Sequence, residues 1–229
     1  MDYLEDVSGP KVSPEMLRLS GIFPFSSGSA IHSDGYQEAM RILFASLPPR
    51  PRAWALCETY MEQAAWIFRP LKRDEIIDDI LTPIYNAKKE GEDLNYEAAQ
   101  AINPHKIAVL YMVFASGALM DLTLPAYNVE AENYHQYARA ALSMRSIFDS
   151  PVMGTIQAIA LMAFYHSNAG RRYTLDGVWT LLSLGAKLAQ SVSGTMANTF
   201  ISTDCWLSTD WTSCVPTLFL ESLCYLSCC

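Results

Sequence analysis

The stretch from Ile107 to Met120 constrains the fold of this chain more than any other feature. It holds no charged residue, and a helix built from it is apolar around its whole circumference. Such a helix is stable in water only when other helices enclose it on all sides. Pro104 stands just ahead, where the first turn of a helix tolerates proline. The sequence therefore predicts a central helix with several partners packed around it.

A second uncharged run extends from Ser150 to Gly170 and is long enough to cross a membrane. It is interrupted by a glycine and several polar residues, which a membrane span disfavours. We therefore expect a buried helix from Val152 to His166 and no membrane segment. Gly170 can adopt the left-handed conformation that ends a helix, so a tight turn should follow and join this helix to the next.

Apolar residues recur at steps of three and four in further segments, which is typical of amphipathic helices. We expect these helices at residues 36–45, 53–68, 74–84, 130–148 and 175–191. The predicted buried stripes include Trp54 in the second of these segments and Phe148 in the fourth. No run alternates with the period of two that a half-buried strand needs. The expected fold is all-α, an array of antiparallel helix hairpins.

Both ends of the chain differ from this body. Residues 1–35 are rich in Ser, Gly and Pro and lack periodic apolar positions, so we expect a disordered, irregular linker there. The organised domain is expected over residues 36–192. Residues 193–229 form a tail rich in Cys, Ser, Thr and Trp with no Lys or Arg. That tail is either disordered or strand-forming, or the product of a retained intron or a shifted reading frame, and the sequence leaves these alternatives open.

Charge and cysteine usage restrict the compartment and the partners. The 24 acidic and 16 basic residues give a net charge of −8, which phosphate backbones repel, so we expect no autonomous nucleic-acid binding. The acidic start is unlike a secretory signal, and no glycosylation sequon occurs. Cys57 stands alone and the other five cysteines crowd into residues 205–229, which is no disulfide framework. A reducing compartment, cytosol or nucleus, is the resulting hypothesis.

Metal-ligand spacings are missing from the chain. A zinc site needs thiolates or imidazoles grouped closely, usually as Cys-x-x-Cys or His-x-x-x-His, and neither occurs. The nearest approach is a C-terminal group with the wrong spacing, Cys224, Cys228 and Cys229. The four histidines are scattered, and we interpret each as a capping or partly buried polar residue: His32, His105, His135 and His166. We therefore assign no metal-ligating, cofactor-binding or catalytic residue, and we expect no enzyme.

One acidic cluster needs separate consideration. All-helical terpenoid synthases hold magnesium and diphosphate with helical Asp-Asp-x-x-Asp carboxylates. Here Asp78 and Asp79 are followed by Thr82 where that pattern requires an acid. Acidic side chains near a helix start are explained by the helix dipole alone. A terpenoid-type enzyme is therefore the weakest of the functional alternatives.

Two segments carry a family resemblance. Residues 150–165 read SPVMGTIQAIALMAFY and are followed by Asn168, by Gly170-Arg171-Arg172, by Val178-Trp179, by Leu182 and Gly185, and by AKLAQS at 186–191. Upstream, residues 56–66 read LCETYMEQAAW, and Phe68-Arg69-Pro70 follows. This pattern resembles the fungal-specific transcription factor domain, the middle homology region of fungal binuclear zinc-cluster regulators of the xylanolytic-activator type. The resemblance covers roughly residues 53–191.

The resemblance implies a role in regulating transcription by RNA polymerase II in the nucleus, through protein partners or a homodimer, with any small-molecule effector unspecified. In the family, zinc and DNA contacts belong to a six-cysteine module, and no cysteine precedes Pro48 here. In the family, the helix that corresponds to the one ending at Ser191 leads into a second helical half of the domain. The residues from Val192 onward do not resemble that second half. We therefore expect residues 36–192 to be the N-terminal half of the regulatory domain, without its DNA reader. A zinc-less module that binds a related regulator is the alternative.

Four residues of the resembling segment invite a ligand role, and for each we expect a structural role instead. We expect Trp179 to pack its ring and Gly185 to allow a close approach of helices. We expect Tyr165 to fill the core and Arg171 to cap a helix end.

Overall fold

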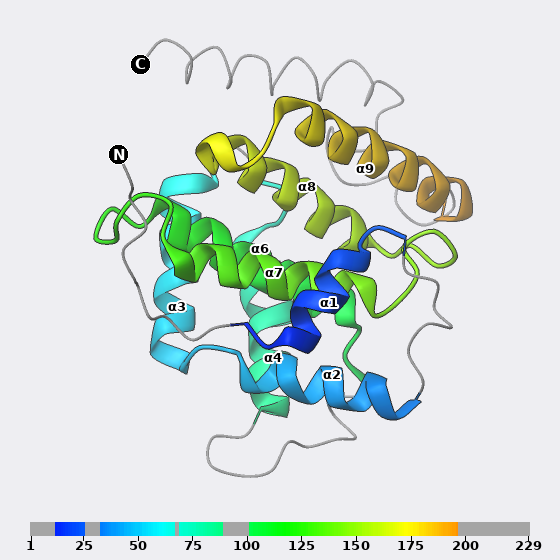
Figure 1. The fold of residues 1–229 in the computed structure, drawn as a ribbon, viewed down its shortest axis with the longest axis horizontal. Helices are drawn as coiled ribbons and strands as arrows, with labels where there is room; N and C mark the ends of the chain where they lie inside the picture. The colour runs from blue at the N-terminus through cyan, green and yellow to red at the C-terminus, as the bar shows by residue number, and fades with distance from the viewer. Residues whose placement is uncertain (1–11, 26–32, 67–68, 89–100, 197–229) are drawn as a thin grey trace.

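The computed structural model describes residues 12–25, 33–66, 69–88 and 101–196 (Figure 1). Every regular element in these ranges is helical, which confirms the all-α prediction. The α-helices are α1 (Pro14–Ile22), α2 (Ser33–Ala45), α3 (Arg50–Thr59), α4 (Thr82–Ala87), α6 (Pro104–Met120), α7 (Val129–Ser143), α8 (Met153–Asn168) and α9 (Leu175–Met196). Two π-helical stretches, η1 (Tyr60–Ala64) and η2 (Glu75–Leu81), and a 3-10 turn, η3 (Gly170–Arg172), complete them.

Helix α6 is the centre of the fold, as its uniform apolar sequence predicted. It packs against α3, α7 and α8 and against both π-helical stretches. Its residues from Ile107 to Ala118 are all buried. The helix begins at Asn103, whose side-chain oxygen accepts a hydrogen bond from the backbone N–H of His105 at 2.9 Å. Gly117 lets α6 approach the backbone of α3 closely, because a Cβ there would lie 2.3 Å from the Leu56 carbonyl oxygen.

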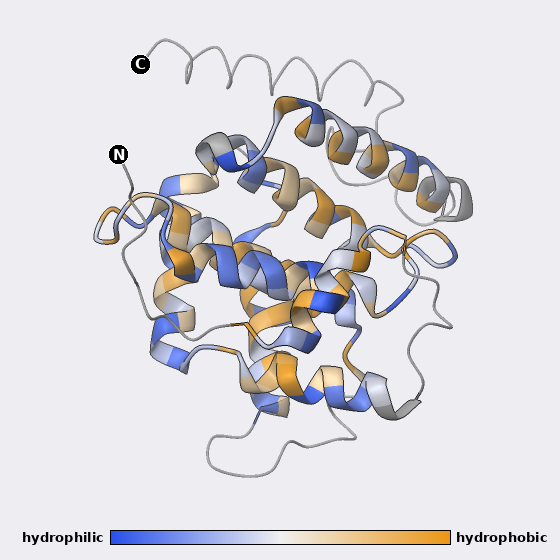
Figure 2. Ribbon diagram, in the orientation of Figure 1, coloured by the Kyte–Doolittle hydropathy of each residue, from blue (hydrophilic) through white to orange (hydrophobic). Residues whose placement is uncertain are grey.

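The other helices lie around α6 in a definite order. Helix α8 packs on α6 and carries α9 on top, while α1 packs on α7 (Figure 1). In α9, apolar and polar residues alternate around the helix (Figure 2), and the apolar side that includes Val178, Leu181 and Leu188 is buried. The predicted hairpin of two helices joined at residues 168–172 is therefore present as α8, η3 and α9. Among the described residues, no helix combines the length and apolar character that crossing a bilayer requires.

The prediction of a disordered linker over residues 1–35 is wrong for residues 14–22, which form α1, and for residues 33–35, which begin α2. The Oγ of Ser13 accepts from the backbone N–H of Met16, and Pro14 occupies the first turn, so the local start signal is complete. Met16 and Leu19 are buried against the body. The buried residues Val12, Met16, Leu19 and Phe23 follow steps of four and three, so the segment does carry an apolar stripe, and this stripe packs against the body. Residues 1–11 and 26–32 lie outside the described ranges.

Three further predictions need correction. Trp54 is 41% exposed. The buried side of α3 is formed by Ala53, Leu56 and Cys57, and the indole lies beside it. Phe148 is 49% exposed, because α7 ends at Ser143 and the chain then turns. Helix α9 continues to Met196, so the first residues of the predicted tail are helical. The rest of that tail, residues 197–229, lies outside the described ranges.

Two buried tyrosines hold the connection between α2 and α3. The Tyr111 hydroxyl donates to the Leu43 carbonyl at 2.6 Å, and the Tyr85 hydroxyl donates to the Pro48 carbonyl at 2.5 Å. Each bond satisfies a carbonyl that the end of α2 or the proline-rich turn leaves without a helical partner. This connection is thereby fixed to the central helix and to α4.

Candidate functional site

A cluster of buried and partly buried polar side chains lies where α7, α8 and η3 meet. Glu132 and His135 stand three residues apart on α7, which places them on one face of that helix. Tyr165 and His166 come from the last turn of α8. Gly170, with φ of 67°, reverses the chain after α8 and brings Tyr173 back onto the same place. We refer to these five residues, Glu132, His135, Tyr165, His166 and Tyr173, as the His-Tyr cluster.

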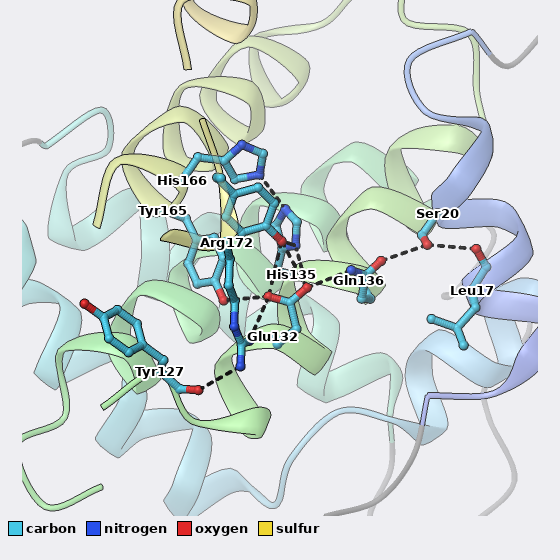
Figure 3. Close-up of polar contacts among 10 residues, drawn as sticks. Leu17, Ser20, Tyr127, Glu132, His135, Gln136, Tyr165, His166 and Arg172 are labelled. Carbon is cyan, nitrogen blue, oxygen red and sulfur yellow. Dashed lines mark hydrogen bonds and ion pairs between the residues drawn. The ribbon is translucent and has the colours of Figure 1, made fainter. Parts of the chain in front are cut away.

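Two imidazole rings meet in the His-Tyr cluster, tilted by 65° relative to each other with centroids 5.0 Å apart (Figure 3). The Nε2 atoms of His135 and His166 are 3.0 Å apart, and the His135 side chain is fully buried. The ring of Tyr165 stacks on His135 with centroids 4.9 Å apart. Tyr173 stacks on His166 more closely, with centroids 3.7 Å apart and planes at 9°. The pair is therefore enclosed by aromatic rings on both sides.

Glu132 collects the hydrogen bonds of this cluster. Its carboxylate accepts from the Tyr173 hydroxyl at 3.0 Å, from the Tyr165 hydroxyl at 3.2 Å and from Nε2 of Gln136 at 2.8 Å. The Nη1 of Arg172 lies 3.5 Å away, and Nδ1 of His135 lies 3.6 Å away. Ser20 of α1 in turn bonds Gln136, so the network reaches a fourth helix (Figure 3).

The protonation states follow from burial and from these contacts. Burial acts to raise the pKa of Glu132, but hydrogen bonding by its partners, His135 first and then Gln136 and Tyr173, outweighs burial and holds that pKa well below its ordinary value. Burial lowers the pKa of His135. Burial and the neighbouring His135 lower the pKa of His166 to about 3. At neutral pH the site therefore holds an ionised carboxylate beside two neutral imidazoles.

The hydrogen bonds define which atoms carry hydrogen. The Tyr173 hydroxyl has one hydrogen and gives it to Glu132, because burial and the nearby carboxylate raise the pKa of Tyr173 and an ionised carboxylate only accepts. Nδ1 of His135, 3.1 Å from that hydroxyl oxygen, then donates to it. A neutral His135 therefore carries no hydrogen on Nε2, and this atom accepts a hydrogen bond from Nε2 of His166. Chemically, the cluster can hold an ordered chain of protons that ends on Glu132.

His105 forms a separate buried contact at the other end of α8. Its Nε2 donates to the Arg145 carbonyl at 3.3 Å, so Nδ1 accepts from the Thr155 hydroxyl at 2.7 Å. The Thr155 oxygen also accepts from the backbone N–H of Val152 at 3.0 Å. Burial lowers the pKa of His105, which keeps this imidazole neutral. Because His105 and Thr155 are fully buried, we interpret the pair as a clamp between the ends of α6, α7 and α8.

The residues singled out from the sequence occupy varied places. Asp78 and Asp79 are exposed on η2. Within the described ranges, no group of three or more His, Cys, Asp or Glu side chains is arranged so that it could hold a metal ion. His32, Cys224, Cys228 and Cys229 lie outside those ranges, as does the side chain of Arg171.

The four residues given structural roles in the resembling segment have mixed outcomes. Tyr165 is 1% exposed and fills the core as expected. A Cβ at Gly185 would lie at an ordinary 3.5 Å from the Ile159 side chain, so the contact of α9 with α8 does not require glycine there. Trp179 is 39% exposed, so the ring packing predicted for it is incomplete.

The pairing of His135 with His166 was not predicted from the sequence. These two histidines are 31 residues apart, and their spacing fits no metal motif. The one local signal was Glu132 and His135 at helical spacing. Nothing local connects them to Tyr165, His166 and Tyr173, which reach the site only through the turn at Gly170.

No family model matches this chain, and neither does any curated protein or any solved structure.

Proposed function

We propose that this chain is a regulatory, non-DNA-reading part of a transcription factor of the fungal zinc-cluster type, and that it acts through protein contacts. The observation that supports the proposal best is the hairpin formed by α8, η3 and α9. The residues that resemble the fungal-specific domain, 150–191, fall on this one structural unit. Gly170 forms the turn of this unit, and the apolar faces of α8 and α9 are buried in it.

The position of α9 favours a role in protein binding. Leu175 is 60% exposed and Trp179 is 39% exposed, and they stand four residues apart on the first turns of α9. Residues at this spacing lie side by side on a helix surface. Exposed large apolar and aromatic side chains of this kind are typical anchors of protein interfaces. The face carried by Leu175 and Trp179 is therefore the part of the domain that we expect a partner to contact.

The charge of the chain argues for indirect contact with DNA. A net charge of −8 opposes binding to a phosphate backbone. Several described arginines are already in ion pairs with carboxylates, among them Arg52 with Asp121 and Glu130, and Arg172 with Glu132. We therefore attribute DNA targeting to a partner or to a separate module.

A tethering experiment tests the proposal. The full chain is fused to an unrelated DNA-binding module and transcription of a reporter with the matching operator is measured in yeast. We expect the fusion to change reporter transcription severalfold relative to the module alone. The double variant Leu175→Ser with Trp179→Ser should lose most of that change. Ser183→Ala, an exposed substitution on the same helix, is the matched control and should behave as the parent.

The outcomes separate the candidate functions. A reporter level equal to that of the module alone, with the fusion present at normal abundance in the nucleus, would contradict a regulatory role. The same null result accompanied by direct binding of the chain to a purified zinc-cluster regulator would favour the alternative, an interaction module. Loss of that binding in the Leu175 and Trp179 double variant would assign the contact to α9.

A further inference from the structure

The His-Tyr cluster joins three segments that are far apart in the chain. His135 lies in α7, His166 in the last turn of α8, and Tyr173 between η3 and α9. The Tyr173 ring covers His166 while its hydroxyl reaches both Glu132 and His135. The start of α9 is thus attached to α7 through the contacts that surround the two imidazoles.

The contact between the two imidazoles depends on the number of hydrogens they carry. At 3.0 Å, one Nε2 must donate and the other must accept. An imidazolium carries hydrogen on both nitrogens. When both rings are protonated, two N–H groups point at each other over 3.0 Å, and the rings must separate. The closed cluster therefore cannot hold the doubly protonated pair.

We propose that the His135–His166 pair is a proton-sensitive latch, and that acidification releases η3 and the start of α9 from α7. This device goes beyond the proposed function and does not depend on it. Separation of the rings frees both from the aromatic enclosure and lets each imidazole take up a proton in water. Opening of a closed pair that holds no proton is thereby coupled to the uptake of two protons, and opening of a singly protonated pair is coupled to the uptake of one.

The charged groups around the pair set the pH range in which the two imidazoles become protonated. On α7 these are Glu132 and Arg139, on α8 the Tyr165 hydroxyl, and between α8 and α9 Arg172 and the Tyr173 hydroxyl. Arg139 disfavours protonation of the closed pair, and Glu132 favours it. Glu132 stays ionised above its own low pKa, so proton uptake between pH 7 and pH 5 belongs to the histidines.

The opening is local because the segment that the latch holds lies at the surface of the fold, where Leu175 is 60% exposed. Helix α9 packs mainly on α8, and the Arg172 side chain is 45% exposed. Segments with few buried contacts open at a lower free energy than the core. Helix α6, buried along nearly its whole length, serves as the internal reference for global unfolding.

Hydrogen exchange of the full chain, read by mass spectrometry in peptides from residues 165–182 and 107–118, tests the latch. With histidine pKa values near 6.5 in the open state, proton coupling raises the opening constant of residues 165–182 by up to roughly 600-fold between pH 7 and pH 5, the value for a closed pair that stays neutral. His166→Gln keeps a hydrogen-bonding side chain but removes one titrating group. This variant should show a smaller rise, at most roughly 25-fold.

Tyr173→Phe is the matched control. It removes the hydroxyl that bonds Glu132 but leaves both histidines, so opening should increase at every pH while its two-proton dependence remains. A rise in residues 165–182 that is unchanged by His166→Gln would overturn the latch. So would parallel opening of residues 107–118 with the same pH dependence, because acid would then unfold the whole domain.

Discussion

Substitution of Gly117 by alanine tests the central packing of the fold. A Cβ at this position would lie 2.3 Å from the Leu56 carbonyl oxygen, whereas such contacts essentially never fall below 3.0 Å. The backbones of α6 and α3 must therefore separate by about 0.7 Å, and backbone cannot rotate away as a side chain can. Overpacking of a core costs about 1–3 kcal/mol, and the higher helix propensity of alanine returns about 0.5–1 kcal/mol. We expect the free energy of unfolding to fall by about 1–2 kcal/mol.

Urea denaturation of the full chain, followed by far-UV circular dichroism, measures this change. A loss of this size also lowers Tm by about 2–8 °C for a domain of this length. Gly185→Ala is the matched control, since this glycine also lies within a helix at a helix contact but a Cβ there would meet Ile159 at an ordinary 3.5 Å. That control should be neutral or stabilising by up to about 1 kcal/mol. If Gly117→Ala is as stable as Gly185→Ala, the close approach of α3 to α6 is refuted.

Further perturbations probe the connections around the core. Tyr111→Phe leaves the buried Leu43 carbonyl without its donor and should lower the free energy of unfolding by about 1–3 kcal/mol in urea titrations; an unchanged value would show that the bond contributes nothing. Gly170→Ala forces a side chain into a left-handed backbone beside the Tyr127 ring, so it should cost at least about 1–2 kcal/mol, while a neutral effect would contradict the turn. Burial holds the pKa of His105 in the folded protein below its value in the unfolded chain. The stability that the neutral imidazole contributes is therefore present at pH 7.5. It is lost as the pH falls below about 6.5, by up to about 1.4 kcal/mol per pH unit. Stability measured from pH 7.5 to 5 should therefore fall less steeply in a His105→Gln variant, and an identical slope would show that His105 titrates normally.

Local periodicity predicted most of the helical architecture. The all-apolar stretch around residues 107–118 identified the central helix, because a helix without a polar face has only one stable environment. Gly170 identified the turn between α8 and α9, because a positive φ of 67° favours glycine. Helix ends were less accurate, and α1 was missed because its apolar stripe, Val12, Met16, Leu19 and Phe23, lies in a short segment among residues rich in Ser, Gly and Pro.

The sequence by itself determined the fold class, the buried centre and the helix hairpin, since each follows from residue spacing within one helix or one turn. Only the tertiary structure decided the His-Tyr cluster and the exposure of Trp54 and Phe148. Burial and hydrogen bonding depend on which distant segments pack together, and His135 meets His166 only because α8 returns across α7. A local pattern carries no information about the partner on the other side of a helix contact, and that partner sets the charge state of each buried imidazole.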